Sequence, residues 1–522
     1  MDKKRVFFFQ MWVKKYRFGQ KTPENICIYQ KKVVPLRQFL IECGMENLIG
    51  RQLEMAELQR ALDSKRSEFV ILYGRRRVGK TFLVRSFCKD KYSFHFVGAH
   101  KQPLNTQLAN FREALQNCNP EAGIPELANW HEAFRQLAKY LEQCKENRKV
   151  VFFDEMPWID TQKSDFVSEL EYFWSSWVQN RDDIVFIACG SATTWMKEKL
   201  EDNQGGLHNR ITHRIYLRPF YLSECKQYLH SNGFDWDDYQ ILQFYMIFGG
   251  VPYYMSLLRP QLSLVENVDA LIFRRGGDLS DEFKELYNAL FKRADKYIRI
   301  VQLLATKREG FTKTEISKET GYSGGGLTKI LENLERCDFV VSYAQYGNKA
   351  KQTLYRLCDF YTLFYFKYVK DNRSKDEQYW LHHFQDRSVE SWEGFTFEEI
   401  CLRHLPHIKR GLGISGIATE ASSWRFVPGK DDIRKGAQVD LVISRADKII
   451  HLCEMKFSAV PYSIKKDYAE RLINRKQLFM EENGIRRGVV LTFVTPYGLK
   501  EGIYTSLVHS TLSAKDLFQL DV

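Results

Sequence analysis

Residues 68–87, EFVILYGRRRVGKTFLVRSF, decide the fold class of this chain. The apolar run 69–73 predicts a buried strand, and the apolar spacing in 81–87 predicts a helix. The turn between them has the spacing GxxxxGK[ST], filled by Gly74, Gly79, Lys80 and Thr81. A strand that enters a helix through a glycine-rich turn is typical of α/β proteins built on a parallel sheet.

This turn predicts a phosphate-binding loop. Glycines let backbone N–H groups approach a phosphate at the positive end of the following helix. Lys80 is expected to reach the β- and γ-phosphates and stabilise the transferred group, and Thr81 is expected to bind Mg²⁺. The other loop residues that should surround the nucleotide are Arg75, Arg76, Arg77 and Val78. The sequence therefore predicts ATP and Mg²⁺ as cofactors.

An acidic pair follows the apolar run in KVVFFDEMPWID, residues 149–160. Such a run should form another parallel strand, with Asp154 and Glu155 at its tip. Asp154 is expected to hold Mg²⁺, directly or through water. Glu155 is expected to polarise the attacking water as general base.

Four other residues are weaker candidates for the same site. Ser191 ends the strand-like run DIVFIACGSA and is either a sensor of the γ-phosphate or an ordinary strand-end serine. Arg210 precedes a further strand and either stabilises the transition state or is a surface arginine. Gly250 and Pro252, in FGGVP, form a rigid turn that could abut the nucleotide base.

These motifs resemble a known family. NLIGRQLEMAEL, YGRRRVGKTFLVR, FFDEMPW, CGSA and FGGVP together look like the archaeal-type ATPases, which are related to the AAA+ and signal-transduction ATPases. The resemblance runs from about Met45 to the chain end. It implies nucleotide contacts in 74–81, Mg²⁺ binding and hydrolysis at Asp154 and Glu155, sensing at Ser191, and lid contacts at Gly250 and Pro252.

Residues 295–370 predict a winged helix, because three helical patterns precede a hairpin. Thr312 and Glu315 have capping-box spacing, and Gly321 should end that helix. The third helix exposes Lys329 and Arg336, but also two glutamates, and the hairpin turn carries Lys349 and Lys351. Phosphate contact with DNA and a role as a protein-contact module or lid both stay open.

A second hairpin joins AQVDLVIS, residues 437–444, to KIIHLCEMKFS, residues 448–458. If the loop has an odd number of residues, paired residue numbers sum to 894, and Asp440 lies across from Glu454 on one face. Lys456 then shares that face. An even loop would put Asp440 on the other face and leave no shared site.

Two opposed carboxylates repel each other and favour a divalent cation. Asp440, Glu454 and Lys456 form the pattern D…ExK, which resembles the PD-(D/E)xK nuclease superfamily, with Val439 in place of the usual proline. That resemblance implies a helical acid, for which Glu398 is the candidate, and a catalytic role for Lys456. The alternative is a surface hairpin with a salt bridge between Asp440 and Lys456.

The net charge of +12 is unevenly spread, because residues 1–40 alone hold ten Lys and Arg against Asp2 and Glu24. A general inference of nucleic-acid binding from charge therefore fails. The eleven cysteines contain no CxxC pair, which favours reduced thiols and a cytoplasmic location. No apolar run approaches the ~18 residues of a membrane span, so no membrane partner is expected.

The fold class we expect is α/β, with a P-loop NTPase parallel sheet, a helical lid, a winged helix-turn-helix and a C-terminal α/β restriction-endonuclease-like domain. The expected parts are a basic N-terminal extension 1–44, for which Met45 is an alternative start, an ATPase core 45–225, a lid 226–294, the winged helix 295–370 and the nuclease-like domain 371–522.

The expected function is ATP binding and hydrolysis coupled to a winged helix and a nuclease-like domain that acts on nucleic acid, with metal-dependent endonuclease activity left open. The alternative is an ATP-switched regulator that binds DNA or a partner and has an inactive nuclease fold. DNA, a protein partner and a second copy of the chain all stay open as partners.

Overall fold

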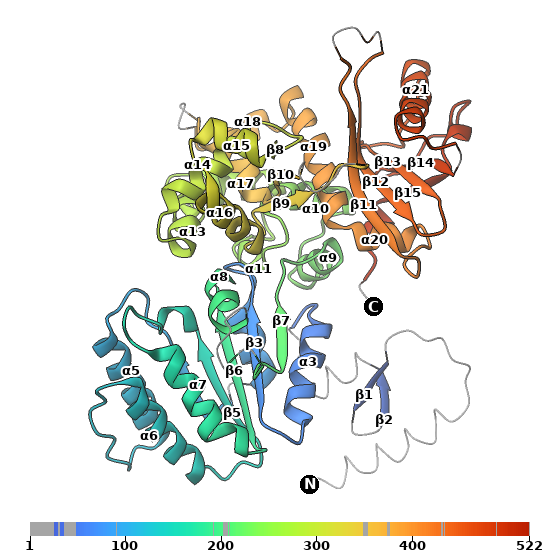
Figure 1. The fold of residues 1–522 in the computed structure, drawn as a ribbon. Coiled ribbons are helices and arrows are strands. Elements are labelled where there is room, and N and C mark those ends of the chain that lie inside the picture. The colour runs from blue at the N-terminus through green and yellow to red at the C-terminus, as the bar shows by residue number, and fades with distance from the viewer. Residues whose placement is uncertain are drawn as a thin grey trace. The chain divides into compact units, whose positions relative to one another are not determined.

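The structure is a computed structural model of the 522-residue chain. It describes residues 26–29, 32–35, 48–89, 91–191, 193–201, 207, 209–347, 353–372, 376–429, 432, 434–486 and 488–520 (Figure 1). The chain divides into two compact units, one of residues 1–48 with 520–522 and one of residues 49–519. In the first unit, the strands β1 (Ile26–Tyr29) and β2 (Lys32–Pro35) pair antiparallel. The rest of the expected extension 1–44 lies outside the described residues.

The larger unit begins with a five-stranded sheet of order β4-β5-β6-β3-β7, and all its strands are parallel, which confirms the predicted parallel sheet. The strands β3, β5 and β6 are buried at every position, because helices cover both faces. The strand bounds are β3 Glu68–Tyr73, β4 Phe94–Val97, β5 Lys149–Asp154, β6 Ile184–Gly190 and β7 His213–Tyr216.

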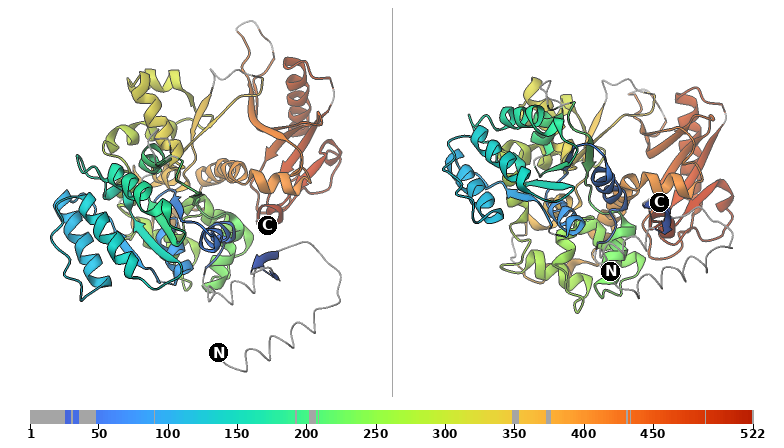
Figure 2. Two further views of the ribbon diagram at one scale, coloured as in Figure 1. Left: turned by 60° about the horizontal axis from the view of Figure 1, so that its bottom comes forward. Right: turned by 90° about the horizontal axis from the view of Figure 1, so that it is seen from below.

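Apolar helix faces make the core of this sheet. One face packs Phe69 and Phe153 of the strands against Phe111 and Phe134 of the helices. Figures 1 and 2 show the helices α5, α6 and α7 side by side on that face. The helix bounds are α3 Gln52–Asp63, α4 Lys80–Cys88, α5 Leu104–Cys118, α6 Trp130–Gln143, α7 Phe166–Ser176 and α8 Thr193–Trp195, followed by the π-helix η3 Met196–Glu201. Short 3₁₀ turns are η1 Met156–Trp158 and η2 Val178–Asn180.

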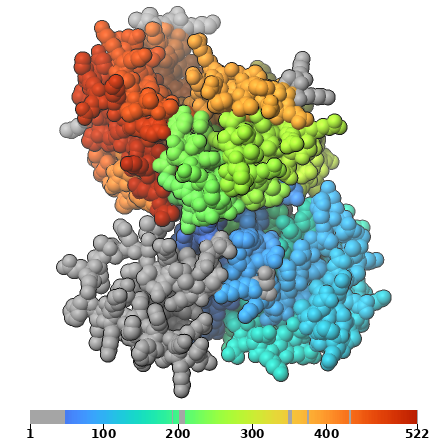
Figure 3. Space-filling model, turned by 180° about the vertical axis from the view of Figure 1, so that it is seen from behind, coloured from blue at the N-terminus to red at the C-terminus, as the bar shows by residue number. Residues whose placement is uncertain are grey.

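A helical lid follows the sheet, as expected. Its longest helix, α10, is apolar nearly all round and is buried against later helices, which explains its lack of a polar face. Figure 3 shows the lid in green, packed against the blue residues of the ATPase core. The bounds are α9 Leu222–Ser231, α10 Asp238–Phe248, α11 Pro252–Ser256, α12 Leu264–Val268, η4 Asp269–Phe273 and α13 Glu282–Leu290.

Three helices and a small antiparallel sheet of order β8-β10-β9 come next. The predicted capping box is present, because Thr312 Oγ1 accepts from Glu315 N at 3.2 Å, and Gly321 ends that helix with φ of 75°. The bounds are α14 Ala294–Leu304, β8 Phe311–Thr312, α15 Lys313–Thr320, α16 Gly324–Arg336, β9 Val340–Tyr343 and β10 Leu354–Leu357. Then follow α17 Phe360–Phe364, η6 Tyr365–Val369 and α18 Tyr379–His383.

The C-terminal part is a mixed sheet of order β11-β12-β13-β14-β15, antiparallel at first and parallel from β13 onward. Its bounds are α19 Arg387–Arg403, α20 Leu405–Gly411, β11 Thr419–Phe426, β12 Ala437–Arg445, β13 Ile450–Met455, α21 Lys466–Glu482, β14 Val489–Val494, η7 Thr505–Leu507, β15 Ser510–Leu512 and α22 Ala514–Leu517. The nine cysteines of the larger unit, from Cys88 to Cys453, are free thiols.

The register of the β12–β13 hairpin is the predicted one. Leu441 pairs with Cys453 and Ser444 with Ile450, so the residue numbers sum to 894. The loop is odd, because Arg445 N donates to Ile449 O at 2.9 Å, and Lys448 closes it with φ of 68°. The odd-loop prediction is confirmed.

Candidate functional site

The glycine-rich loop lies between β3 and α4, as the motif predicted. Gly79 has φ of 89°, a left-handed conformation that favours glycine. A Cβ on Gly74 would lie 2.2 Å from Leu217 O, so that position has no room for a side chain. Lys80 is 5% exposed, and its Nζ donates to Gly74 O at 3.1 Å and Arg75 O at 2.8 Å. Burial lowers the pKa of Lys80.

The predicted Mg²⁺ ligands meet at the carboxyl edge of the sheet. Thr81 Oγ1 donates to Asp154 Oδ2 at 2.8 Å. Thr81 follows β3 and Asp154 ends β5, and β6 lies between these two strands. The other oxygen, Asp154 Oδ1, accepts from Glu155 N at 2.9 Å. A hydroxyl and a carboxylate are hard oxygen ligands, and Mg²⁺ is commonly bound by one or two carboxylates with phosphate oxygens. These two residues therefore fit a Mg²⁺ site.

Glu155 and Ser191 contact each other directly. Glu155 has φ of 46°, which turns its side chain toward the tip of the neighbouring strand β6. Its Oε2 accepts from Ser191 Oγ at 2.9 Å and from Ser191 N at 3.4 Å. The arrangement brings together the general-base and sensor candidates and orients the Glu155 carboxylate.

Two of the loop arginines turn their side chains away from the phosphate cradle. Arg75 is 2% exposed and forms an ion pair with Asp359, which is 3% exposed and caps α17. Burial would lower the pKa of Arg75, but the charge of Asp359 outweighs it and the pKa is raised. Arg77 pairs with Glu282 at 2.8 Å, and its guanidinium lies 4.1 Å from the Tyr253 ring centre. Nucleotide contact by the side chains of Arg75 and Arg77 is therefore corrected, and only their backbone groups face the loop.

The remaining two loop residues differ in exposure. Arg76 is partly exposed, whereas Val78 is 1% exposed and its carbonyl accepts from Arg51 at 3.2 Å. Val78 can therefore contribute only backbone groups.

The Gly250–Pro252 turn contacts the loop through its backbone, since Tyr253 N donates to Arg77 O at 3.4 Å. A Cβ on Gly250 would lie 1.8 Å from Phe220 O, and Phe220 N donates to Gly250 O at 2.6 Å. Gly250 therefore allows close backbone packing against Phe220, and its contact with the base stays a prediction. Pro252 begins α11 beside this contact.

Arg210 lies at the wrong edge of the sheet for this chain's own site. Thr212 N donates to Phe69 O at 2.9 Å, near the start of β3, whereas Gly74 follows the end of β3. Phe69 and Gly74 are five residues apart along the strand, which is a distance of roughly 17 Å. The prediction that Arg210 reaches the γ-phosphate within one chain is therefore wrong.

The second candidate site is on the β12–β13 hairpin. The β12–β13 pairs end at Leu441 and Cys453, and β12 has an extra residue between Val439 and Val442, so strand alternation does not place Asp440 on the face of Glu454 and Lys456. Lys456 Nζ lies 3.5 Å from Glu454 Oε2, and Gln438 donates to Asp440 Oδ1 at 2.7 Å. The salt bridge of the alternative, between Asp440 and Lys456, is not among the ion pairs of the described residues.

Two residues that the sequence interpretation missed complete the surroundings of Glu454. Tyr468 donates its hydroxyl to Glu454 Oε2 at 2.6 Å, and Arg475 forms an ion pair with Glu454. Both come from α21, where Tyr468, Arg471 and Arg475 recur at helical spacing. The sequence spacing indicated that these side chains share one face of a helix. Only the packing of α21 shows that this face contacts β13.

Glu398 approaches from α19, as expected, and its carboxyl is strongly perturbed. Burial, together with the charge of Asp440, raises the pKa of Glu398 to about 8. Yet no group of three or more His, Cys, Asp or Glu side chains is arranged to hold a metal ion in the described parts of the chain. Asp440, Glu454 and Glu398 thus do not form such a group in the structure, where Arg475 and Lys456 lie against Glu454.

The basic residues of α16 are engaged within the chain. Lys329 Nζ lies 3.3 Å from Glu198 Oε1, and Arg336 lies 3.8 Å from the same atom. The carboxyl half of α16 therefore faces the ATPase core. Lys349 and Lys351 lie outside the described residues.

Residues 48–258 match the model of a family described as an ATPase domain predominantly from Archaea. The chain belongs to this family through that segment. The archaeal-type ATPase domain explains why Thr81, Asp154, Glu155 and Ser191 converge on one glycine-rich loop.

Two proteins of Methanocaldococcus jannaschii are similar to this archaeal-type ATPase. The uncharacterized protein MJECL04 is 22% identical over 428 residues, which are 81% of this chain and 90% of that protein. The uncharacterized ATP-binding protein MJ0423 is 40% identical over 48 residues, 9% of this chain and 81% of that protein.

Among solved structures, the Walker-type ATPase PABY2304 of Pyrococcus abyssi is similar over 62% of this chain and 96% of its own, with 17% identity and a TM-score of 0.46. The Aeropyrum pernix ORC2 protein, in ADPNP–ADP complexes, is similar over 60% and 92%, with 17% identity and a TM-score of 0.40. No helix in the described part of the chain combines the length and the apolar character that crossing a membrane requires.

Proposed function

We propose that this protein binds ATP with Mg²⁺ at the β3–α4 loop and hydrolyses it. The observation that carries the proposal is the hydrogen bond of 2.8 Å between Thr81 and Asp154, beside Glu155 and the buried Lys80. These groups come from separate segments of the chain, and a purely structural role does not explain their convergence on a glycine loop.

Each residue has a distinct part in the proposed reaction. Thr81 and Asp154 would hold Mg²⁺, which when bound neutralises charge on the phosphate oxygens. Lys80 would exchange its contacts with Gly74 O and Arg75 O for phosphate oxygens. Glu155 would accept a proton from the attacking water, and its contact with Ser191 sets the direction of the carboxylate.

We propose that nucleotide binding at the loop affects the conformation of the segment around α17 through Arg75. Its carbonyl receives the Lys80 ammonium, and its side chain forms the buried ion pair with Asp359. A change at Lys80 on nucleotide binding would therefore alter the backbone that carries Arg75. Because Asp359 caps α17 directly after the β9–β10 hairpin, movement there would shift the hairpin and the helices that follow.

Action on nucleic acid is the second part of the proposal. Residues 294–357 have the helices and hairpin of a winged helix, and the amino end of α16 is exposed at Gly324–Gly326. Lys313 and Lys318 line a hollow at that end, so phosphate contact is supported there and not at Lys329 or Arg336.

Metal-dependent cleavage at the hairpin is a second candidate function, supported by the position of Lys456 beside Glu454 and by the charge of Asp440, which helps raise the pKa of Glu398. The order α19, β11, β12, β13, α21, β14 also supports a restriction-endonuclease-like fold. The ion pair of Arg475 with Glu454 favours the alternative, a regulator in which this fold does not cut.

The test uses the full-length chain in two assays. ATP hydrolysis should be present in the wild type and lost in Lys80→Ala, and its absence in the wild type would reject the proposed function. Nicking of plasmid DNA with Mn²⁺ or Mg²⁺ is measured in parallel. Nicking that is lost in Lys456→Ala supports the nuclease, whereas equal nicking by both proteins points to a contaminant and supports the regulator.

A further inference from the structure

Gln107 lies on the first turn of α5 and is completely buried, with 0% of its surface exposed. Its side-chain amide donates to Ala99 O at 2.7 Å and to Trp158 O at 2.9 Å, and its oxygen accepts from Ala99 N at 3.1 Å. Both donors and the acceptor of the side chain are therefore in use. Ala99 follows β4 and Trp158 follows β5, so one side chain connects the loops after two neighbouring strands.

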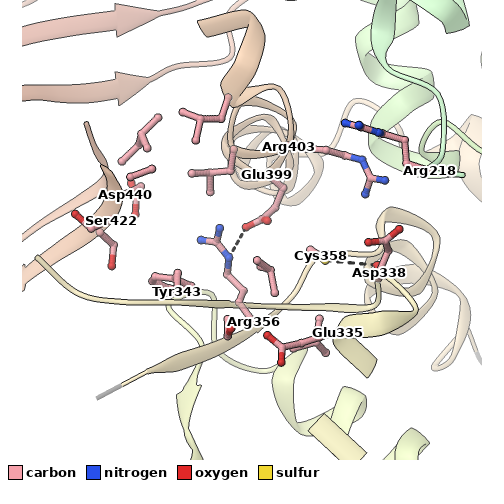
Figure 4. Close-up of a pocket in the computed structure, with 18 of the residues that line it drawn as sticks. Arg218, Glu335, Asp338, Tyr343, Arg356, Cys358, Glu399, Arg403, Ser422 and Asp440 are labelled. Carbon is pink, nitrogen blue, oxygen red and sulfur yellow. Dashed lines mark hydrogen bonds and ion pairs between the residues drawn. The ribbon is translucent and has the colours of Figure 1, made fainter. Parts of the chain in front are cut away.

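This bonding pattern differs from that of a buried ion pair. Arg356 and Glu399, on the wall of a cavity of about 640 Å³, join one side chain to another (Figure 4). A pair of that kind fixes two elements to each other. The three hydrogen bonds of Gln107 instead go to backbone groups, so they fix the course of the two loops themselves.

The loop after β5 carries Glu155, the proposed general base. Glu155 has φ of 46° and ψ of 44°, a left-handed conformation that is unfavourable for a residue with a Cβ. Such a conformation persists only where the surroundings enforce it. Trp158 N donates to Glu155 O at 2.9 Å, which closes the turn η1. Gln107 holds the carbonyl of the same Trp158, so it fastens the far end of the turn that begins at Glu155.

The loop after β4 packs against the same turn. Gly98 N donates to Asp154 O at 2.9 Å, and a Cβ on Gly98 would lie 2.5 Å from Glu155 O. The next residue, Ala99, is the one that Gln107 holds at both its N–H and its carbonyl. A shift of this loop would therefore displace the backbone of Glu155.

We propose that Gln107 is a positioning residue for ATP hydrolysis. It holds the backbone of Glu155 in the conformation that directs the carboxylate to Ser191, with 2.9 Å between Oε2 and Oγ. This role rests on the proposed function, in which Glu155 accepts the proton of the attacking water. Lys80 and the glycine-rich loop follow β3, and β6 lies between that strand and β5. Binding of the phosphates should therefore not depend on Gln107, whereas the rate of hydrolysis should.

The experiment measures kcat and the Kd for ATP in the full-length chain. Gln107→Met keeps the length of the side chain and removes its donors and its acceptor. The kcat should fall by about tenfold to a hundredfold, because a small displacement of a catalytic group lowers the rate steeply. The Kd for ATP should stay within about twofold of the wild-type value.

The matched control is Gln116→Met, at the other end of the same helix. Gln116 makes the same three kinds of contact with the loop that follows α5. Its amide donates to Asn119 O at 3.3 Å and Pro120 O at 2.9 Å, and its oxygen accepts from Ile124 N at 3.3 Å. Because that loop does not carry Glu155, Gln116→Met should keep the wild-type kcat.

A double-mutant cycle separates positioning from a general loss of structure. Gln107 and Ser191 are proposed to act on the same carboxylate, so Gln107→Met should lower kcat by less than about threefold in a Ser191→Ala background. If Gln107→Met only damaged the structure, its effect and that of Ser191→Ala would multiply.

The proposal is overturned if Gln107→Met keeps the wild-type kcat, if Gln116→Met loses as much, if the Kd for ATP rises in step with the loss of kcat, or if the cycle is multiplicative. If Gln107→Met does not fold, Gln107→Glu, which keeps the size and the acceptor but loses the amide donors, is judged by the same criteria. A wild type without turnover would reject the proposed function and this role together. An active wild type with an equally active Gln107→Met rejects this role alone.

Discussion

The glycine-loop site and the hairpin site are both built from acids at strand ends, yet they differ in what the acids contact. At the loop, Asp154 accepts from the Thr81 hydroxyl and Glu155 from Ser191, so the carboxylates keep their charge for a cation and for water. At the hairpin, Glu454 contacts Arg475, Lys456 and Tyr468. A carboxylate that accepts from hydroxyls can still bind a metal ion or accept a proton. A carboxylate that is paired with cations must first be released from those ion pairs.

The largest effect expected is on hydrolysis at the loop. Glu155→Gln should lower the turnover of ATP by roughly 10²–10⁴-fold, because the amide cannot accept the proton of the attacking water. Ser191→Ala should lower it less, since the carboxylate remains and loses only its orientation. Steady-state phosphate release with matched measurement of ATP binding distinguishes the two. Equal turnover by Glu155→Gln and the wild type would contradict the assignment.

The Arg75–Asp359 ion pair should have the next largest effect. Asp359→Asn keeps an acceptor for the α17 cap but leaves Arg75 buried without its counter-charge, so the unfolding free energy should fall by about 3–5 kcal/mol. Combining it with Arg75→Met should recover part of the loss. Urea unfolding midpoints measure both variants.

The matched control for that pair is Lys329→Ala, which breaks an exposed ion pair and should change stability by about 1 kcal/mol or less. If Asp359→Asn lowers the unfolding free energy no more than this control does, the buried ion pair contributes no more to stability than an exposed one.

Removing Arg475 should let Glu454 bind a divalent cation, as the carboxylates of the loop site are expected to do. Arg475→Gln frees Glu454, so Mn²⁺ should raise the melting temperature of this variant more than that of the wild type, by mass action. Adding Asp440→Asn should remove the gain. Arg471→Gln is the control, because Arg471 contacts the Tyr468 ring and not Glu454. An equal Mn²⁺ response in Arg475→Gln and the wild type would reject this site for a metal.

The last effect expected is on the pH dependence of stability. The pKa of Glu398 is raised to about 8 in the folded chain, from an ordinary value of 4.5, so the folded state binds this proton more tightly than the unfolded chain does. Stability should therefore fall as the pH rises from about 4.5 to 8. Thermal unfolding of Glu398→Gln should show a flatter profile in that window, and Glu390→Gln, an exposed acid on the same helix, should keep the wild-type slope.

Much of the first site could be predicted because its geometry follows from the backbone. Parallel strands end at one edge of a sheet, so the tips of β3, β5 and β6 had to lie together, and Thr81, Asp154, Glu155 and Ser191 with them. Arg210 was misjudged because the sequence does not say whether β7 runs parallel to β3. The two strands are parallel, so the residues before β7 lie at the edge of the sheet opposite the loop.

The hairpin shows the same division within one site. The odd loop fixed the register from Leu441–Cys453 to Ser444–Ile450, but an extra residue of β12 interrupts the alternation at Asp440. The cation on Glu454 comes from α21, whose orientation over β13 depends on helix packing and not on any local pattern. The prediction of a formed metal site failed there.

By itself, the sequence determined the glycine-rich loop, the strand-end acids and the capping box at Thr312, because each depends on local spacing. It left the hairpin register open between an odd and an even loop, and the structure has the odd one. Only the tertiary structure decided that Arg75 pairs with Asp359, that Arg475 holds Glu454 and that Arg356 pairs with Glu399. Long charged side chains reach several ångströms in many directions. Their partners are therefore set by which segments pack together, because a buried charge is stable only beside a counter-charge that another segment supplies.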